Sequence, residues 1–183
     1  MPESDPAFFG YGSLVNLATH GYADPCPARL TGWRRVWRST TLREAAFLSV
    51  DPAPGVTLDG IAARVPGADW LALDAREAAY TRIDVSETLG LGCPAAVYRV
   101  SDGLTLPTTT GHMILRSYLD VVVQGYFRVF GPTGVSDFFD TTTGWEVGIK
   151  DDRAAPLYPR AQTLSDIETA QVDHHLRRLS VPH

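Results

Sequence analysis

Apolar residues come in short blocks along the first sixty-odd positions of the chain, and glycine and proline separate one block from the next. Blocks of this length with such boundaries are typical of β-strands. The sequence therefore predicts a β-rich first part. The predicted strands are 7–12, 29–39, 42–50 and 58–65, and a further strand follows at 94–100.

Two segments in the middle of the chain have the composition of helices. The segment 68–83 is rich in alanine and leucine and follows Pro66-Gly67. It carries Asp69 at the position where a side chain caps the amino terminus of a helix. A second helix is predicted over 111–126.

The last third of the chain combines irregular and helical segments. Glycines punctuate 131–148, and 150–161 is predicted to be extended. A final helix is predicted over 163–179, because Ser165 and Glu168 have the spacing of a capping box.

These elements together predict an α+β fold, in which a small mixed β-barrel or curved sheet is surrounded by helices. The length of 183 residues and the hydrophobic content of 44% suit one domain with its own core. We therefore expect a single domain over 1–183, with a helical extension after about residue 103.

Charge and cysteine content narrow the class of partner. The formal net charge of −5 disfavours binding to the negatively charged phosphate backbone of a nucleic acid, so a small molecule is the expected partner. Cys26 and Cys93 lie far apart and in no metal-ligand spacing, which suits a reduced cytosolic protein. The acidic stretch 1–9 lacks the features of a signal peptide, and no apolar run has the length of a membrane span. We expect a cytoplasmic protein that contacts no membrane.

One stretch of this acidic chain is basic and aromatic. It runs over 29–44 and interleaves arginines with Trp33 and Trp37, a mixture found in proteins that bind single-stranded nucleic acid. Nucleic-acid binding is therefore one alternative. The acidic remainder of the chain favours a strand pair with the arginines on its outer face, namely Arg29, Arg34, Arg35, Arg38 and Arg43.

The first predicted strand ends in Gly10-Tyr11-Gly12-Ser13. Glycine adopts backbone angles closed to other residues and lets another atom approach the main chain closely. Such an ending predicts a turn with exposed amide N–H groups, where a small anion could bind. Two common motifs do not fit: a dinucleotide fingerprint would need glycine at Val15, and a hydrolase nucleophile elbow would need a second glycine after Ser13.

Glu77 is a candidate for proton transfer. A helix over 68–83 would align one carboxylate with apolar and aromatic residues on a single stripe, composed of Trp70, Leu73, Glu77 and Tyr80. In one interpretation the carboxylate reaches a solvent edge or an arginine. In the other it is desolvated, with a raised pKa that suits acid–base catalysis near neutral pH.

Three stretches, in this order, resemble the γ-glutamylcyclotransferase family, including its glutathione-specific and γ-glutamylamine-specific branches. They are FGYGSLVN at 9–16, LTGWRRVW at 30–37 and LDAREAAYTRIDV at 73–85. The resemblance covers about the first hundred residues. Beyond these, SYLDVVVQGY at 117–126 is similar to the helix that follows the last barrel strand in that family. The resemblance implies the γ-glutamylcyclotransferase-like fold.

The resemblance also implies a role for each candidate residue. Glu77 would be the general acid and base that helps a γ-glutamyl group to cyclise to 5-oxoproline with release of an amine. Tyr118 is added as a pocket hydroxyl, with a tyrosine packed at the edge of the core as the other interpretation. No metal, nucleotide or other cofactor is implied. The α-carboxylate and amino end of the substrate would be held by the turn Tyr11, Gly12, Ser13 and Leu14.

The alternative to an enzyme is a non-catalytic protein of the same fold that binds a small anion. An enzyme requires Glu77 and the turn at Tyr11 in one cavity, whereas a binding protein does not. Asp151-Asp152-Arg153 is expected to form a salt-bridged loop rather than a metal site. No pattern in the sequence specifies the leaving amine or the oligomeric state.

Overall fold

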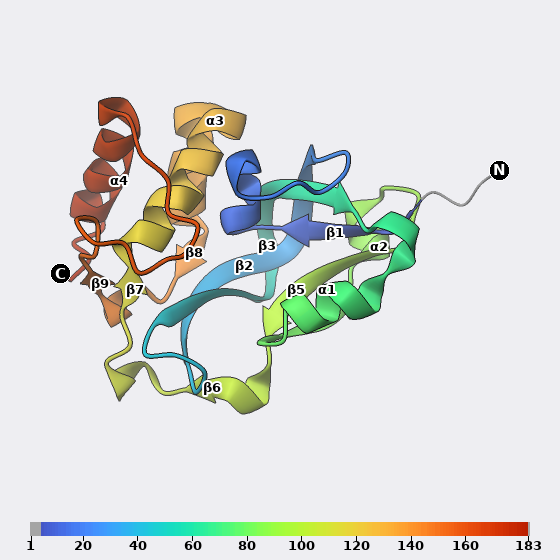
Figure 1. Cartoon of the computed structure of the whole chain (residues 1–183), viewed down its shortest axis with the longest axis horizontal. Coiled ribbons are helices and arrows are strands. Elements are labelled where there is room, and N and C mark those ends of the chain that lie inside the picture. Colours follow the sequence, from blue (N-terminus) through green and yellow to red (C-terminus); the bar gives the residue numbers. More distant parts are fainter. Residues whose placement is uncertain (1–4, 183) are drawn as a thin grey trace.

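A curled mixed sheet forms the centre of the fold (Figure 1). The computed structural model describes residues 5–182, so residues 1–4, on which the signal-peptide expectation partly rests, and residue 183 lie outside the described residues. The strand order is β4-β5-β1-β3-β2-β6, and β8 pairs with β2. Helices surround the sheet, which confirms the predicted α+β class. The strands of this sheet are β1 (Ala7–Gly10), β2 (Cys26–Thr40), β3 (Ala46–Arg64), β4 (Tyr80–Asp84), β5 (Ala95–Val100), β6 (Thr105–Leu106) and β8 (Thr142–Thr143).

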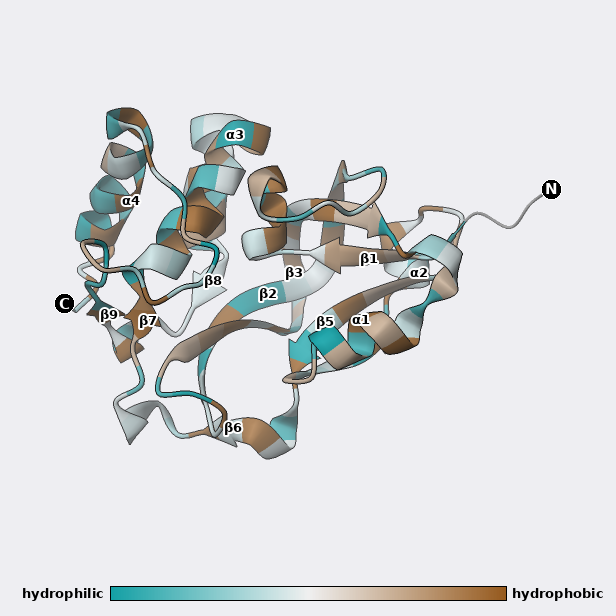
Figure 2. Cartoon of the chain, in the orientation of Figure 1, coloured by the Kyte–Doolittle hydropathy of each residue, from teal (hydrophilic) through white to brown (hydrophobic). Residues whose placement is uncertain are grey.

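The helices lie on both sides of β1. Phe8 and Phe9 point to opposite faces of this strand, as successive strand residues do. Phe9 packs in the main core with residues of α3 (Arg116–Asp140), and Phe8 packs in a second core with Leu73 of α1 (Trp70–Arg76). Figure 2 shows the apolar character of β1, in contrast to the largely hydrophilic α4. The turn that follows β1 therefore starts between two packed layers.

The helices are α1 (Trp70–Arg76), α2 (Ser86–Leu89), α3 (Arg116–Asp140) and α4 (Asp166–Arg178), and a separate strand pair is formed by β7 (Ile114–Leu115) and β9 (Ile149–Lys150).

β3 is a single long strand where the sequence predicted two strands, 42–50 and 58–65. It pairs with β2 on both sides of an irregularity, at which Thr31 opposes Thr57 but Trp33 opposes Pro52. Pro54 and Gly55, which lie between Pro52 and Thr57, belong to this bulge and do not reverse the chain. The prediction of a break was therefore wrong, because a β-bulge absorbs turn residues without ending a strand.

The predicted helix over 68–83 is also wrong in its second half. α1 ends at Arg76, Glu77 is its carboxyl-terminal cap, and Tyr80 begins β4. β4 pairs antiparallel with β5 at the edge of the sheet. The segment contains β-branched residues, which favour a strand where such pairing is possible. Asp69 does cap the helix, since its side chain accepts a hydrogen bond from the amide of Ala72.

The second half of the chain contains more helix than predicted. The helix expected over 111–126 begins at Arg116 and continues to Asp140, although Gly131 interrupts its helical geometry and Pro132 follows. The segment 131–148, predicted only as glycine-punctuated, is thus helical in its first part. The capping box of the last helix is present as predicted, and α4 packs against α3.

Gly125 of α3 lies against the backbone of the chain just after the turn. A Cβ atom added there would stand 2.5 Å from the amide nitrogen of Asn16. Asn16 is itself fixed, because its side-chain amide donates to the carbonyl of Val121 and to Gln124, both at 2.9 Å. The glycine thus lets α3 approach and support the segment that follows β1.

We expect Gly125→Ala to lower the free energy of unfolding by about 1–3 kcal/mol, as overpacking of a tight contact does. Urea denaturation with a spectroscopic readout measures this change. Gly21→Ala is the matched control, because a Cβ at Gly21 meets no atom within 4 Å. Equal unfolding midpoints for the two variants would contradict the close contact.

Among residues 5–182, the helices are all too short or too polar to cross a membrane. Within the same range, no group of three or more histidine, cysteine, aspartate or glutamate side chains is arranged to hold a metal ion.

Candidate active site

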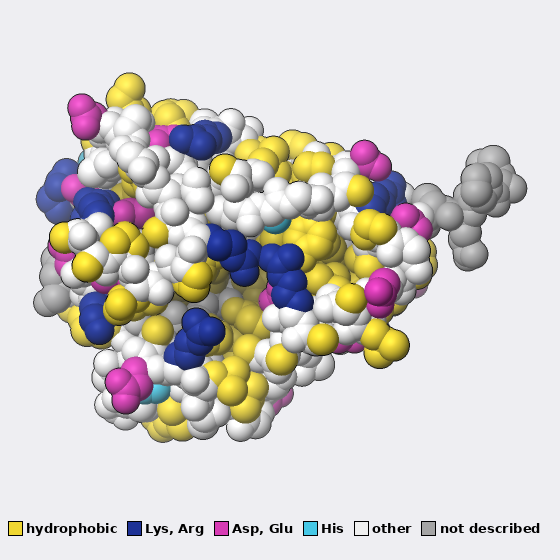
Figure 3. All heavy atoms as spheres, viewed as in Figure 1, with side chains coloured by type: hydrophobic (Ala, Val, Ile, Leu, Met, Phe, Trp, Pro, Cys, Tyr) yellow, Lys and Arg dark blue, Asp and Glu magenta, His cyan; other side chains and the backbone are white. Residues whose placement is uncertain are grey.

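A cavity of about 400 Å³ opens between the turn after β1 and the segment that follows α1. The start of β3, the first turn of α3 and part of the carboxyl-terminal segment complete its wall. Figure 3 shows this face of the molecule, hollowed near its centre. All the residues that the sequence singled out as candidates line this one cavity, namely Tyr11, Gly12, Ser13, Leu14, Glu77 and Tyr118.

The turn supplies amide N–H groups to the cavity. β1 ends at Gly10, and one turn of 3₁₀-helix follows over Ser13–Val15. Its carbonyl groups are used within the turn, since Gly12 accepts from Val15 and Ser13 accepts from Asn16, each at 3.0 Å. In the described part of the chain, no backbone carbonyl accepts a hydrogen bond from the amides at positions 12–14. These donors at a helix amino terminus suit a carboxylate.

Tyr118 fixes the shape of this turn. A Cβ atom at Gly12 would lie 2.7 Å from the Tyr118 hydroxyl oxygen, so a larger residue there would displace this hydroxyl from the turn. The Tyr118 ring packs edge-on against Trp37 and against Tyr158. Burial raises the pKa of Tyr118 well above its usual value, although hydrogen bonds with Ser13 act in the opposite direction. The hydroxyl therefore stays protonated at neutral pH and remains a donor beside the turn.

A buried cation lies behind the turn. Arg35 is 1% exposed, and its Nε donates to the Tyr11 carbonyl at 3.1 Å. Its other guanidinium donors reach the hydroxyl groups of Tyr126 and Thr141 and the carbonyl of Asp59. Within residues 5–182, no aspartate or glutamate side chain forms an ion pair with it.

This cation acts on the amide of Gly12. The carbonyl that accepts from Arg35 belongs to the peptide unit between Tyr11 and Gly12. A positive charge at the oxygen of a peptide polarises its N–H and makes it a stronger donor. The prediction that Arg35 lies on the outer face of a strand pair was therefore wrong. Its two-residue spacing from Trp33 and Trp37 was the signal that placed it on the inner, aromatic face.

Glu77 occupies the opposite wall. Its amide donates to the Leu73 carbonyl at 2.9 Å, which closes α1, and its carbonyl accepts from the Tyr80 amide at 2.8 Å. The side chain is 24% exposed. Burial raises the pKa of this carboxyl, and the nearby charges of Arg76 and Arg160 partly offset that rise. Glu77 is thus a partly desolvated carboxylate that faces the amide-lined turn.

Two further tyrosines of the cavity direct their hydroxyl groups into the protein. Tyr11 donates to the Tyr98 carbonyl at 2.6 Å, and Tyr80 donates to the Leu48 carbonyl at 3.1 Å. Burial is the first cause that raises the pKa of both phenols, and the charge of Glu77 contributes to each. Their rings therefore supply apolar, water-excluding walls near Glu77, while Tyr118 offers its hydroxyl to the turn.

The carboxyl-terminal segment contributes side chains that sequence reasoning did not find. Asp152 accepts from the amide of Ser117 at 2.8 Å and from its hydroxyl at 2.5 Å, and it also accepts from the Leu157 amide. This anchors the segment to the start of α3, so that Tyr158 and Arg160 line the cavity. No periodicity signals such a placement, because the segment is irregular.

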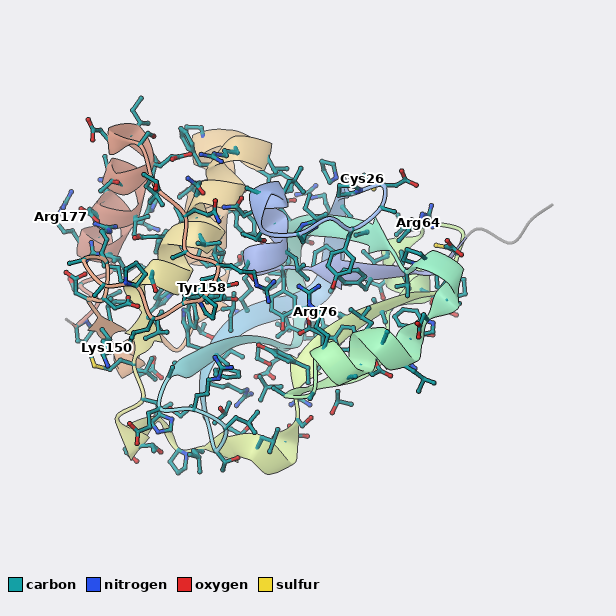
Figure 4. All side chains as sticks on the ribbon, in the orientation of Figure 1. Cys26, Arg64, Arg76, Lys150, Tyr158 and Arg177 are labelled. Atoms are coloured by element: carbon teal, nitrogen blue, oxygen red, sulfur yellow. The ribbon has the colours of Figure 1, made fainter. Side chains whose placement is uncertain are left out.

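The prediction of a salt-bridged loop at 151–153 holds for Arg153 alone, and its carboxylate partners lie outside the loop. Arg153 donates to both carboxylate oxygens of Asp120 at 2.7 Å and lies 3.3 Å from Asp173. Figure 4 labels Tyr158 on this side of the cavity and Arg76 at the end of α1 on the other. The irregular segment on one side is thus held by hydrogen bonds and ion pairs, and α1 carries the other side.

Comparison with solved structures identifies the fold. A structure described as a gamma-glutamyl cyclotransferase matches with a TM-score of 0.55 and 14% identity, over 92% of this chain and 98% of that one. An uncharacterised human protein matches with a TM-score of 0.55 and 15% identity, over 93% and 99%. YkqA from Bacillus subtilis matches with a TM-score of 0.52 and 18% identity, over 76% of this chain and 56% of that one. No protein-family model matches the sequence, and no curated protein does. At these identities the likeness establishes the fold alone.

Proposed function

We propose that this chain, which has the γ-glutamylcyclotransferase-like fold, is an enzyme that cyclises a γ-glutamyl group to 5-oxoproline and releases an amine. The observation that carries the proposal is the pairing of two features across one cavity. The amides at positions 12–14, which donate to no described backbone carbonyl, line the same cavity as Glu77, a carboxylate whose pKa is raised by burial. An anion site beside a proton acceptor is what a zwitterionic γ-glutamyl end requires.

The first step is recognition of the substrate's α-carbon end. The α-carboxylate accepts hydrogen bonds from the amides of the turn and from the Ser13 hydroxyl. The α-ammonium then points toward Glu77, which lies on the opposite wall. The γ-glutamyl chain is held folded, with its amine near its own γ-carbonyl. Fixing an intramolecular attack geometry can lower the barrier by several kcal/mol.

Glu77 then moves one proton out and back. The ionised carboxylate accepts a proton from the α-ammonium, and the neutral amine attacks the γ-carbonyl carbon. The new C–N bond closes the five-membered ring, and the tetrahedral intermediate collapses as the old amide C–N bond breaks. Protonated Glu77 returns the proton to the departing nitrogen. The ring nitrogen gives up its one surplus proton to the released amine, which leaves as an ammonium ion. The products are 5-oxoproline and a free amine, and this sequence needs no covalent nucleophile and no cofactor.

The proposal is tested by incubating the purified protein with a γ-glutamyl amino acid, glutathione and a γ-glutamyl alkylamine, and by measuring 5-oxoproline chromatographically. Formation of 5-oxoproline from at least one of these supports the enzyme. Calorimetric binding of the same compounds without any turnover would favour the non-catalytic anion-binding protein. Neither binding nor turnover would overturn both.

The raised pKa of Glu77 predicts the pH dependence of the reaction. Glu77 must be ionised to accept a proton, so kcat/KM should rise with pH through the pKa of this group in the free enzyme. Since burial raises that pKa, the rising limb should lie above the ordinary carboxyl value of 4.5. Arg160 lowers the pKa, so Arg160→Gln should shift the limb to higher pH. A limb at or below the ordinary value in both proteins would contradict this assignment.

A further inference from the structure

Arginine side chains surround the mouth of the cavity. Arg43 comes from the connection between β2 and β3, Arg76 ends α1, and Arg160 belongs to the carboxyl-terminal segment. Figure 3 shows such dark-blue side chains gathered about the hollow on this face. Three segments that are remote in sequence thus each bring one positive charge to the same opening.

Few carboxylates of the described residues pair with these three arginines. Arg43 and Arg160 form no ion pair with a described aspartate or glutamate, and Arg76 has Glu77 at 3.8 Å as its carboxylate neighbour. Arg153, in the same carboxyl-terminal segment as Arg160, is instead paired with two aspartates. The field of Arg160 reaches into the cavity, since it lowers the pKa of Glu77 against the rise that burial causes.

The proposed chemistry does not use this surplus of positive charge. The α-carboxylate of the γ-glutamyl end is matched by the amides of the turn, and its ammonium is matched by Glu77. The remaining charges lie at the mouth, where the departing part of the substrate would lie. A cavity lined by one sign of charge concentrates ligands of the opposite sign, and guanidinium groups bind carboxylates with two parallel hydrogen bonds. A cationic amine would meet repulsion there.

Resting on the proposed function, we propose that the leaving amine carries a carboxylate, so that the substrate is a γ-glutamyl amino acid or peptide and not a γ-glutamyl alkylamine. Arg160 binds that carboxylate, and Arg43 contributes to the attraction. The carboxyl-terminal segment thereby selects the substrate's second half, while the turn and Glu77 act on its first half.

A matched pair of compounds tests this proposal. γ-Glutamyl-α-aminobutyrate and γ-glutamyl-propylamide differ only in the carboxylate of the leaving amine. We expect kcat/KM to be at least about tenfold higher for the first, as loss of a charge-assisted hydrogen bond implies. Arg160→Gln should lower the ratio of the two kcat/KM values about tenfold, chiefly through KM, and Arg43→Gln should lower it less. Arg177→Gln, an exposed arginine at the far end of α4, should leave the ratio unchanged (Figure 4).

Use of a ratio separates this proposal from the acid–base role of Glu77, because a change in the pKa of Glu77 affects both compounds alike. Equal cleavage of the two compounds, or an unchanged ratio in Arg160→Gln, would overturn the selection of a carboxylate. If neither compound nor glutathione yields 5-oxoproline, the proposed function fails, and calorimetric affinities for the matched pair then decide the selection. Tighter binding of the carboxylate compound that is lost in Arg160→Gln would still support it, and equal affinities would overturn it.

Discussion

Replacement of Glu77 by glutamine is expected to reduce kcat/KM for 5-oxoproline formation by about 10²–10⁴-fold, the range that general acid–base catalysis supplies. Glutamine has the same shape but cannot accept the proton of the α-ammonium. Substrate affinity should change far less than kcat, because the amides of the turn still hold the α-carboxylate. Glu87→Gln is the matched control, since Glu87 is an exposed carboxylate outside the cavity. Full activity of Glu77→Gln would exclude Glu77 as the acid and base.

The same variant should not lose stability at neutral pH. Burial raises the pKa of Glu77 in the folded protein, so the folded state binds this proton more tightly than the unfolded state does. Ionisation of Glu77 therefore destabilises the fold progressively as the pH rises from the unfolded pKa through the folded pKa. Glutamine carries no charge and avoids that loss. Thermal unfolding at pH 7 should show Glu77→Gln at least as stable as the natural protein, and the difference should diminish at low pH. A large loss of stability at pH 7 would instead indicate a structural role.

The sequence predicted the candidate site better than it predicted the elements that carry it. Glu77 lines the cavity, but it does so as the cap of a seven-residue helix and not from a long helical stripe. Tyr80 reaches the same cavity from β4. The local alanine and leucine content favours helix, whereas the free edge of β5 offers backbone partners to the next segment. That competition is decided by tertiary pairing, which no local pattern contains.

From the sequence, Arg35 was misplaced and Tyr158 and Arg160 were missed, for two different reasons. Arg35 had a usable signal, since strand alternation places it on the face of Trp37, but the assumption that arginines face solvent outweighed it. For Tyr158 and Arg160 the sequence contains no such signal. Their position depends on the hydrogen bonds between Asp152 and Ser117, which join residues 35 positions apart. Such contacts form between distant parts of the folded chain and produce no periodic pattern in the sequence.

Arg35→Met is expected to weaken binding of 5-oxoproline or of a γ-glutamyl substrate by about 10–100-fold, as loss of a charged hydrogen-bonding group does. Methionine removes the positive charge behind the Tyr11–Gly12 peptide but retains much of the buried volume. The free energy of unfolding should fall by about 1–3 kcal/mol. The loss is limited because the Tyr126 hydroxyl still lies within hydrogen-bond distance of the carbonyls of Tyr11 and Asp59, at 3.0 Å and 2.8 Å, and can donate to either. Calorimetry measures the affinity and urea denaturation measures the stability.

A conservative variant separates the charge from the packing. Arg35→Lys keeps a positive charge near the turn but loses the planar fork that reaches several acceptors at once. It should therefore be destabilised much like Arg35→Met and yet bind the anionic ligand more tightly than that variant does. Arg34→Met, an exposed neighbour on the same strand, should match the natural protein in both measurements. If the lysine and methionine variants bind equally, the buried charge does not act on the turn. The affinity of the amides at Gly12–Leu14 would then arise from their geometry alone.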